Sequence, residues 1–85
     1  MPLFIQLSKK ERDKLFSSLK YKYGSSWEEI YPIFGISRAM FFNYLSGRNL
    51  IPIEIFLHMQ KISNVNIKQF YKILRDKYIE KKVTF

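Results

Sequence analysis

The sequence predicts an all-α fold, a compact bundle of about five short helices in a single domain over residues 1–85. Apolar residues recur at helical spacing in successive segments, and each segment begins at a capping residue or a proline. Strand alternation is absent apart from LFIQL, a candidate extended arm within residues 1–7. A hydrophobic fraction of 47% supplies enough apolar side chains for one folded core.

The first helix is expected at residues 9–23. Ser8 and Glu11 form a capping-box pattern, in which the hydroxyl accepts from a first-turn N–H and the carboxylate reaches back to the cap. Gly24 follows as a natural stop, because glycine tolerates the backbone conformation that ends a helix. The apolar stripe of this helix comprises Leu15, Phe16, Leu19 and Tyr23.

The second helix is expected to begin near Trp27 and to be short. Ser26 and Glu29 repeat the capping-box pattern, and Gly35 can adopt the left-handed conformation that closes a helix. Pro32 lies inside this segment, where a proline removes a backbone hydrogen bond and clashes with the preceding turn. We therefore expect a kink here, or a wider angle to the next helix.

The third helix is expected at residues 38–45. Ser37 is its N-cap, and Ser46 and Gly47 end it. Two short helices joined by a tight turn that contains a glycine form a helix-turn-helix. The second and third helices together predict that arrangement.

Two further helices are expected in the second half of the chain. Pro52 suits the first turn of a fourth helix, whose broad apolar face leaves a narrow polar stripe that includes His58. Asn66 can cap a fifth helix over residues 66–82. The apolar stripe of that helix comprises Ile67, Phe70, Tyr71, Leu74 and Tyr78.

Residues 26–52, SWEEIYPIFGISRAMFFNYLSGRNLIP, resemble the helix-turn-helix of phage-repressor-like (Cro-type, XRE-like) DNA-binding domains. The resemblance covers about residues 8–65. Two positions depart from the family pattern, since Tyr31 replaces a small residue at the helix crossing and Pro32 follows it. The matching positions are Phe34, Gly35, Ile36, Ser37, Arg38, Phe41, Tyr44, Leu45, Ser46, Gly47, Arg48, Ile51 and Pro52.

The resemblance implies sequence-specific binding of double-stranded DNA by a small transcriptional regulator, with the third helix in the major groove. The family commonly binds as dimers. Ile79 and Val83, four residues apart on the fifth helix, are candidate homodimer contacts, and the LFIQL arm is another. Because the absence of cysteine suits an intracellular location, we expect a cytoplasmic, nucleoid-associated protein.

Helical phase separates an inner from an outer face of the third helix. Phe41, Tyr44 and Leu45 are expected to point inward. The resemblance makes the outer face the base-reading one: a guanine suits the fork of an arginine, an adenine suits asparagine, and a thymine methyl suits apolar side chains. Phe42 has a second interpretation besides base reading, which is burial against the fourth helix or against a protein partner. The outer residues are Arg38, Ala39, Phe42 and Asn43.

Phosphate contacts are expected at the start of the second helix, at the cap of the third and in the loop after it, where backbone N–H groups and one arginine are available. Each candidate also has a simpler role, as a cap, a packed side chain or a solvated loop residue. The candidates are Ser26, Trp27, Ser37, Arg48 and Asn49.

Charge supports a polyanionic partner. The net charge is +8, with residues 1–25 carrying six Lys/Arg against two acids, residues 26–50 two against two, and residues 51–85 seven against three. Basic flanks could hold phosphates while the neutral centre reads bases. Two solvated helix faces would give the same distribution.

Two rival functions share the helix-turn-helix fold. One is a protein-interaction module that presents Phe42 and Met40 to a protein groove. The other is the DNA-targeting domain of a larger recombinase or homing endonuclease. Binding-site selection and the length of the gene, respectively, would separate them from a regulator.

Several classes of function lack the residues they need. The chain has no cysteine, one histidine and no glycine-rich phosphate loop, so we expect no metal ion, no cofactor and no catalytic residue. We expect that the protein is not an enzyme and that it has no small-molecule substrate. No apolar run approaches the ~20 residues that cross a bilayer, and the basic charges do not border one coherent apolar face, so we expect no membrane partner.

Overall fold

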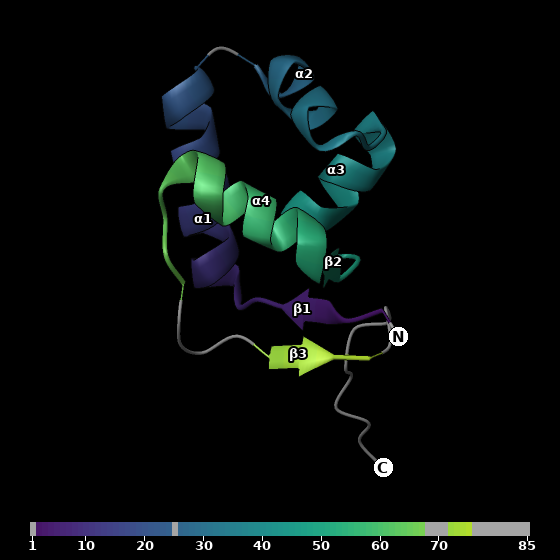
Figure 1. Ribbon diagram of the computed structural model, residues 1–85. Helices are drawn as coiled ribbons and strands as arrows, with labels where there is room; N and C mark the ends of the chain where they lie inside the picture. The colour runs from purple at the N-terminus through teal and green to yellow at the C-terminus, as the bar shows by residue number, and fades with distance from the viewer. Residues whose placement is uncertain (1, 25, 68–71, 76–85) are drawn as a thin grey trace.

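The computed structural model describes residues 2–24, 26–67 and 72–75, and they form an α+β domain (Figure 1). The predicted all-α bundle of five helices is therefore wrong. The described part contains four α-helices, one 3-10 helix and a three-stranded antiparallel sheet in the order β2-β1-β3. The elements are β1 Phe4–Gln6, α1 Lys9–Tyr23, α2 Trp27–Ile30, η1 Tyr31–Phe34, α3 Arg38–Ser46, β2 Ile51–Pro52, α4 Ile53–Ser63 and β3 Lys72–Leu74.

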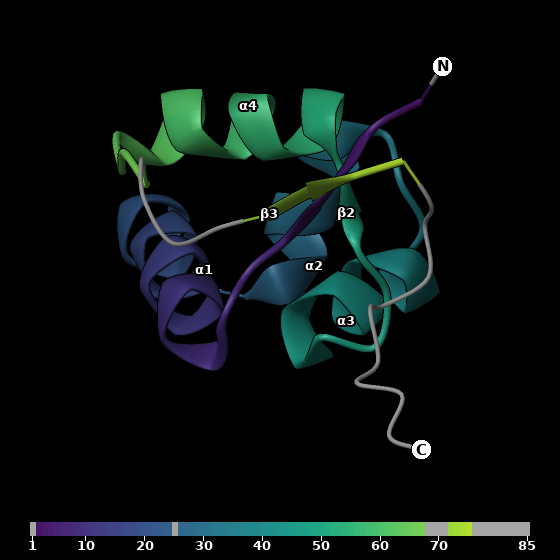
Figure 2. The same ribbon diagram turned by 90° about the horizontal axis from the view of Figure 1, so that it is seen from below.

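The sheet lies across one end of the helical part. Figure 2 looks onto that end, with α4 along one side of the strands and α1 and α3 on the other. The LFIQL arm contributes the central strand, because Ile5 pairs with Ile51 of β2 and with Ile73 of β3. Ile5 is 1% exposed, so this arm is part of the core. Such short strands form only by pairing with distant segments, which a local pattern does not reveal.

The predicted fifth helix is wrong where the structure describes it. Residues 65–67 have no regular secondary structure, and Lys72–Leu74 forms β3. Ile67 is buried in the core without belonging to a helix. The candidate dimer contacts Ile79 and Val83 lie outside the described residues.

The first helix is confirmed at Lys9–Tyr23. The Ser8 hydroxyl accepts from the Glu11 N–H at 3.1 Å, and the Ser8 N–H donates to Glu11 Oε1 at 2.8 Å, which completes the capping box. Gly24 ends the helix with φ 84°. Leu15, Phe16 and Leu19 are buried, whereas Tyr23 lies outside the core.

The segment between Trp27 and Gly35 changes helix type at Tyr31. α2 has four residues and continues as the 3-10 helix η1, in which Pro32 occupies one of the first two positions and needs no N–H. Gly35 then adopts the left-handed conformation at φ 67°. The capping box expected here does not form, because the Ser26 side chain makes no cap hydrogen bond.

An aromatic cluster joins α3 to α1, α2 and η1. The Phe41 ring lies at its centre, with ring centroids 5.4 Å from both Phe16 and Trp27 and 6.2 Å from Tyr31. Phe41 is fully buried. Because α1 and α2 both contact this one side chain, they fix the inner face of α3 in place.

Candidate nucleic-acid interface

α3 begins at Arg38 and has the caps that the sequence predicts, and it ends at Ser46, one residue later than expected. The Ser37 hydroxyl accepts from the Met40 N–H at 3.2 Å, and Gly47 ends the helix in the left-handed conformation. The inward phase is confirmed, since Phe41 and Tyr44 are buried and Leu45 is half-buried. Ser37 thus uses its side-chain oxygen as a cap.

The outer face of α3 is graded in exposure. Arg38 and Ala39 are exposed, while Phe42 and Asn43 are half-buried. Met40, which follows Ala39, is 41% exposed and does not belong to the core. All four predicted base-reading residues are therefore at least partly accessible to solvent.

Arg38 contacts a carboxylate and an aromatic ring. Its Nε donates to Glu28 Oε2 at 2.8 Å, and its Cζ lies 4.7 Å from the centroid of the Phe42 ring. The hydrogen bond from Arg38 lowers the pKa of the Glu28 carboxyl, and the same bond raises the pKa of Arg38. Sequence reasoning missed Glu28, because only the turn at Gly35 brings the first turns of α2 and α3 together.

Phe42 connects this exposed group to the aromatic cluster. Its ring packs edge-on against Phe41, with centroids 5.8 Å apart and an interplanar angle of 85°. The half-buried ring therefore rests on the core on one side and lies beneath Arg38 on another. This contact with the core supports a fixed ring orientation.

Trp27 packs against α1, as its simpler interpretation predicts. Its ring meets Phe16 edge-on at 6.4 Å between centroids, and Lys20 Nζ lies 4.9 Å from the Trp27 ring. Ser26 beside it is half-buried. Lys20 is thus a basic group of α1 near the start of α2.

The loop after α3 exposes Arg48 and Asn49, the remaining phosphate candidates. Its backbone is held against α3, because the Asn49 N–H donates to the Asn43 carbonyl at 3.1 Å. The Ser46 hydroxyl donates to the same carbonyl at 3.3 Å. Arg48 therefore projects from a loop with a defined backbone path.

Arg12 of α1, which the sequence analysis did not single out, binds the carboxyl end of α3. Its Nε donates to the Leu45 carbonyl and its Nη1 to the Leu7 carbonyl, both at 3.3 Å. The guanidinium lies against Gly47, where an added Cβ would be 2.6 Å from Arg12 Cζ. A cavity of about 100 Å³ beside it is lined by Tyr44 and Asn49 and by parts of β1 and β2.

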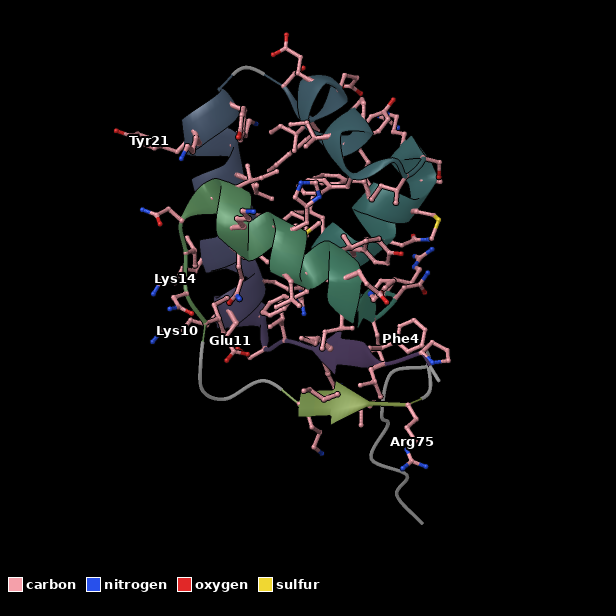
Figure 3. All side chains as sticks on the ribbon, viewed as in Figure 1. Phe4, Lys10, Glu11, Lys14, Tyr21 and Arg75 are labelled. Carbon is pink, nitrogen blue, oxygen red and sulfur yellow. The ribbon has the colours of Figure 1, made fainter. Side chains whose placement is uncertain are left out.

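Basic residues are divided between two sides of the molecule. Lys10 and Lys14 project from the side of α1 that is turned away from α3 (Figure 3). Lys9 pairs with Asp13 at 2.9 Å on α1. The first turns of α1 therefore do not share a face with α3, whereas Arg48 is exposed in the loop that directly follows it.

Two features bear on other kinds of site. His58 is exposed on α4, and its ring packs edge-on against Phe34 at 5.0 Å between centroids. Among residues 2–24, 26–67 and 72–75, no three His, Cys, Asp or Glu side chains are grouped to hold a metal ion. No helix in the described part of the chain is both long and apolar enough to cross a membrane.

Comparison with known proteins adds no relative. The chain matches no protein-family model, no curated protein and no solved structure.

Proposed function

We propose that the protein binds double-stranded DNA sequence-specifically, as a small transcriptional regulator whose α3 enters the major groove. The observation that carries the proposal is the division of α3 into two faces. Phe41 and Tyr44 anchor the helix in the core, while Arg38, Ala39 and Asn43 remain accessible to a ligand. A helix of nine residues fits a major groove about 12 Å wide, where arginine and asparagine can read base edges.

Charge and loop geometry support the same proposal. The net charge of +8 favours association with DNA, Arg48 is exposed in the loop that follows α3, and Lys20 of α1 lies over the Trp27 ring at the start of α2. We expect a cytoplasmic, nucleoid-associated regulator that binds as a homodimer, since the family that the sequence resembles commonly does so. A selected motif with two-fold symmetry would support the dimer.

The test is selection of binding sites from random duplex DNA at near-physiological salt. We expect an enriched motif that loses information at one position for Arg38→Ala and at another for Asn43→Ala. Lys61→Ala is the matched control, because it removes a positive charge from α4 and should leave the motif intact. Weak binding without a motif, abolished by salt, would contradict the proposal.

The protein-interaction module remains a second candidate because Met40 is 41% exposed on α3. Phe42, the other side chain that such a module would present, is partly covered by Arg38. A DNA-targeting domain of a larger recombinase or homing endonuclease would give the same selected motif, and a longer coding sequence would identify it.

A further inference from the structure

We infer that Glu28 and Phe42 are positioning residues that hold Arg38 ready to read a guanine, so that Glu28 determines specificity without touching a base. This inference rests on the proposed function. It assigns a role to a carboxylate on the face proposed to meet DNA, where a negative charge would otherwise oppose binding.

The geometry leaves the recognition edge of Arg38 open. A guanidinium has five N–H donors in a rigid fork. Glu28 accepts a hydrogen bond from Nε, and Cζ of Arg38 lies over the Phe42 ring, 4.7 Å from its centroid. The hydrogen bond to Glu28 uses Nε of Arg38, and in the proposed complex the two Nη atoms donate to O6 and N7 of one guanine.

Stability alone does not account for this arrangement. The side chains of Arg38 and Glu28 are 63% and 55% exposed, and exposed ion pairs contribute little to folding. A fixed arginine, however, loses less conformational freedom when it binds than a free one. Reading groups whose rotamers are locked by neighbouring side chains discriminate better than loosely held ones.

Glu28 also penalises non-specific binding. If Arg38 turned away to contact a phosphate, the Glu28 carboxylate would be left unpaired in the negative field of the DNA. In the guanine-reading position the ion pair persists, and that repulsion is reduced. Glu28 therefore weakens complexes with non-specific DNA more than the complex in which Arg38 reads a guanine. A repulsive element creates specificity in this way.

The experiment compares Glu28→Gln, Phe42→Leu and Arg38→Ala with Glu54→Gln. Glu54 lies exposed in the first turn of α4, so its substitution makes the same charge change outside this cluster. Binding is measured by fluorescence anisotropy on the selected duplex, and on a duplex with the Arg38-dependent base pair exchanged. A good bidentate contact discriminates by roughly 5- to 150-fold, and Arg38→Ala should lose that preference.

Glu28→Gln should remove part of that preference, while it raises affinity for the exchanged duplex. Phe42→Leu should reduce the preference with less effect on overall affinity, because no charge changes. Glu54→Gln should leave the ratio unchanged. If Glu28→Gln raises both affinities equally, Glu28 only competes for Arg38, and the inference is overturned.

A measurement without DNA separates this inference from the proposed function. The Phe42 ring should shift the Arg38 side-chain protons upfield in the NMR spectrum of the free protein, and Glu28→Gln and Phe42→Leu should both reduce that shift. Ordinary shifts in the wild-type protein would overturn the positioning role. If the shift is present but no motif is selected, the proposed function fails and guanine reading fails with it. A motif that depends on Arg38 but not on Glu28 leaves the function standing and removes the inference alone.

Discussion

The two ends of α3 are each held by an arginine, in opposite ways. At the carboxyl end, the half-buried Arg12 donates to the Leu7 and Leu45 carbonyls and lies against Gly47. At the amino end, the exposed Arg38 is bound by the Glu28 carboxylate and the Phe42 ring. Backbone carbonyls fix Arg12 as a cross-link within the fold, whereas side-chain partners in solvent leave Arg38 able to take a ligand. Burial and partner type, more than residue type, separate the structural carboxyl end from the amino end that we propose reads DNA.

Among the substitutions that test this comparison, Gly47→Ala should lower the free energy of unfolding most. The left-handed φ of 84° strains any side chain by about 1–2 kcal/mol, and a Cβ would also displace Arg12 from its two carbonyls. Including loss of those hydrogen bonds, the free energy of unfolding should fall by about 2–4 kcal/mol in urea denaturation. In an Arg12→Ala background the same change should cost only the strain. An equal cost in both backgrounds would show that Arg12 and Gly47 are not coupled.

Arg12→Ala should have the next largest effect and separates the two arginines directly. Loss of two hydrogen bonds to partly buried carbonyls should lower the free energy of unfolding by about 1–3 kcal/mol. Arg38→Ala is the matched arginine truncation and should leave the denaturation midpoint unchanged, because its partners are exposed. DNA affinity, compared at equal fractions of folded protein, should fall more for Arg38→Ala than for Arg12→Ala. Equal destabilisation by both substitutions would remove the distinction between the ends.

Local sequence signals predicted the α3 ends and much of α1 because capping is a local property. Ser8, Ser37 and Gly47 act within a few residues of the helix end that each of them fixes. The contacts from Arg12 to Leu45 and from Glu28 to Arg38 escaped prediction because each joins two different helical segments, as local capping does not. Arg12 and Glu28 are charged residues in ordinary helix positions, and only the folded structure reveals their partners.

The sheet was missed for a related physical reason. Residues 67–78 have apolar side chains at helical spacing, yet Lys72–Leu74 pairs with β1 and is a strand. Three residues are too few to show strand alternation, so tertiary pairing overrides the helical pattern. The buried Ile5 carried no local sign that it would lie between two other strands.

Alkaline pH should weaken the carboxyl end of α3 selectively. Burial raises the pKa of the Tyr44 hydroxyl, which lines the same cavity as Arg12. Its neutral form is favoured in the folded state, so the stabilisation is complete below the usual tyrosine pKa of about 10 and is lost as pH rises through the folded value. Tyr44→Phe should flatten the fall in unfolding free energy above about pH 10, and Tyr21→Phe, at an exposed position, is the control substitution. Parallel profiles for wild type and Tyr44→Phe would contradict this expectation.

Acid should affect only the amino end, and by the smallest amount. The hydrogen bond from Arg38 lowers the pKa of Glu28 below its usual 4.5, so the pair contributes above that value and is lost as pH falls through the lower, folded-state pKa. Because both side chains are exposed, thermal stability should barely respond. An NMR titration of the Glu28 carboxyl carbon should show its pKa return toward 4.5 in Arg38→Ala, and the upfield shift of the Arg38 protons should decrease as Glu28 protonates in the wild type. If the Arg38 protons keep their shift after protonation, the Phe42 ring alone positions the arginine, and the carboxylate acts through its charge. That outcome would retain the contrast between the two ends of α3. The aromatic cluster, through Phe42, would then be what holds the Arg38 side chain in place.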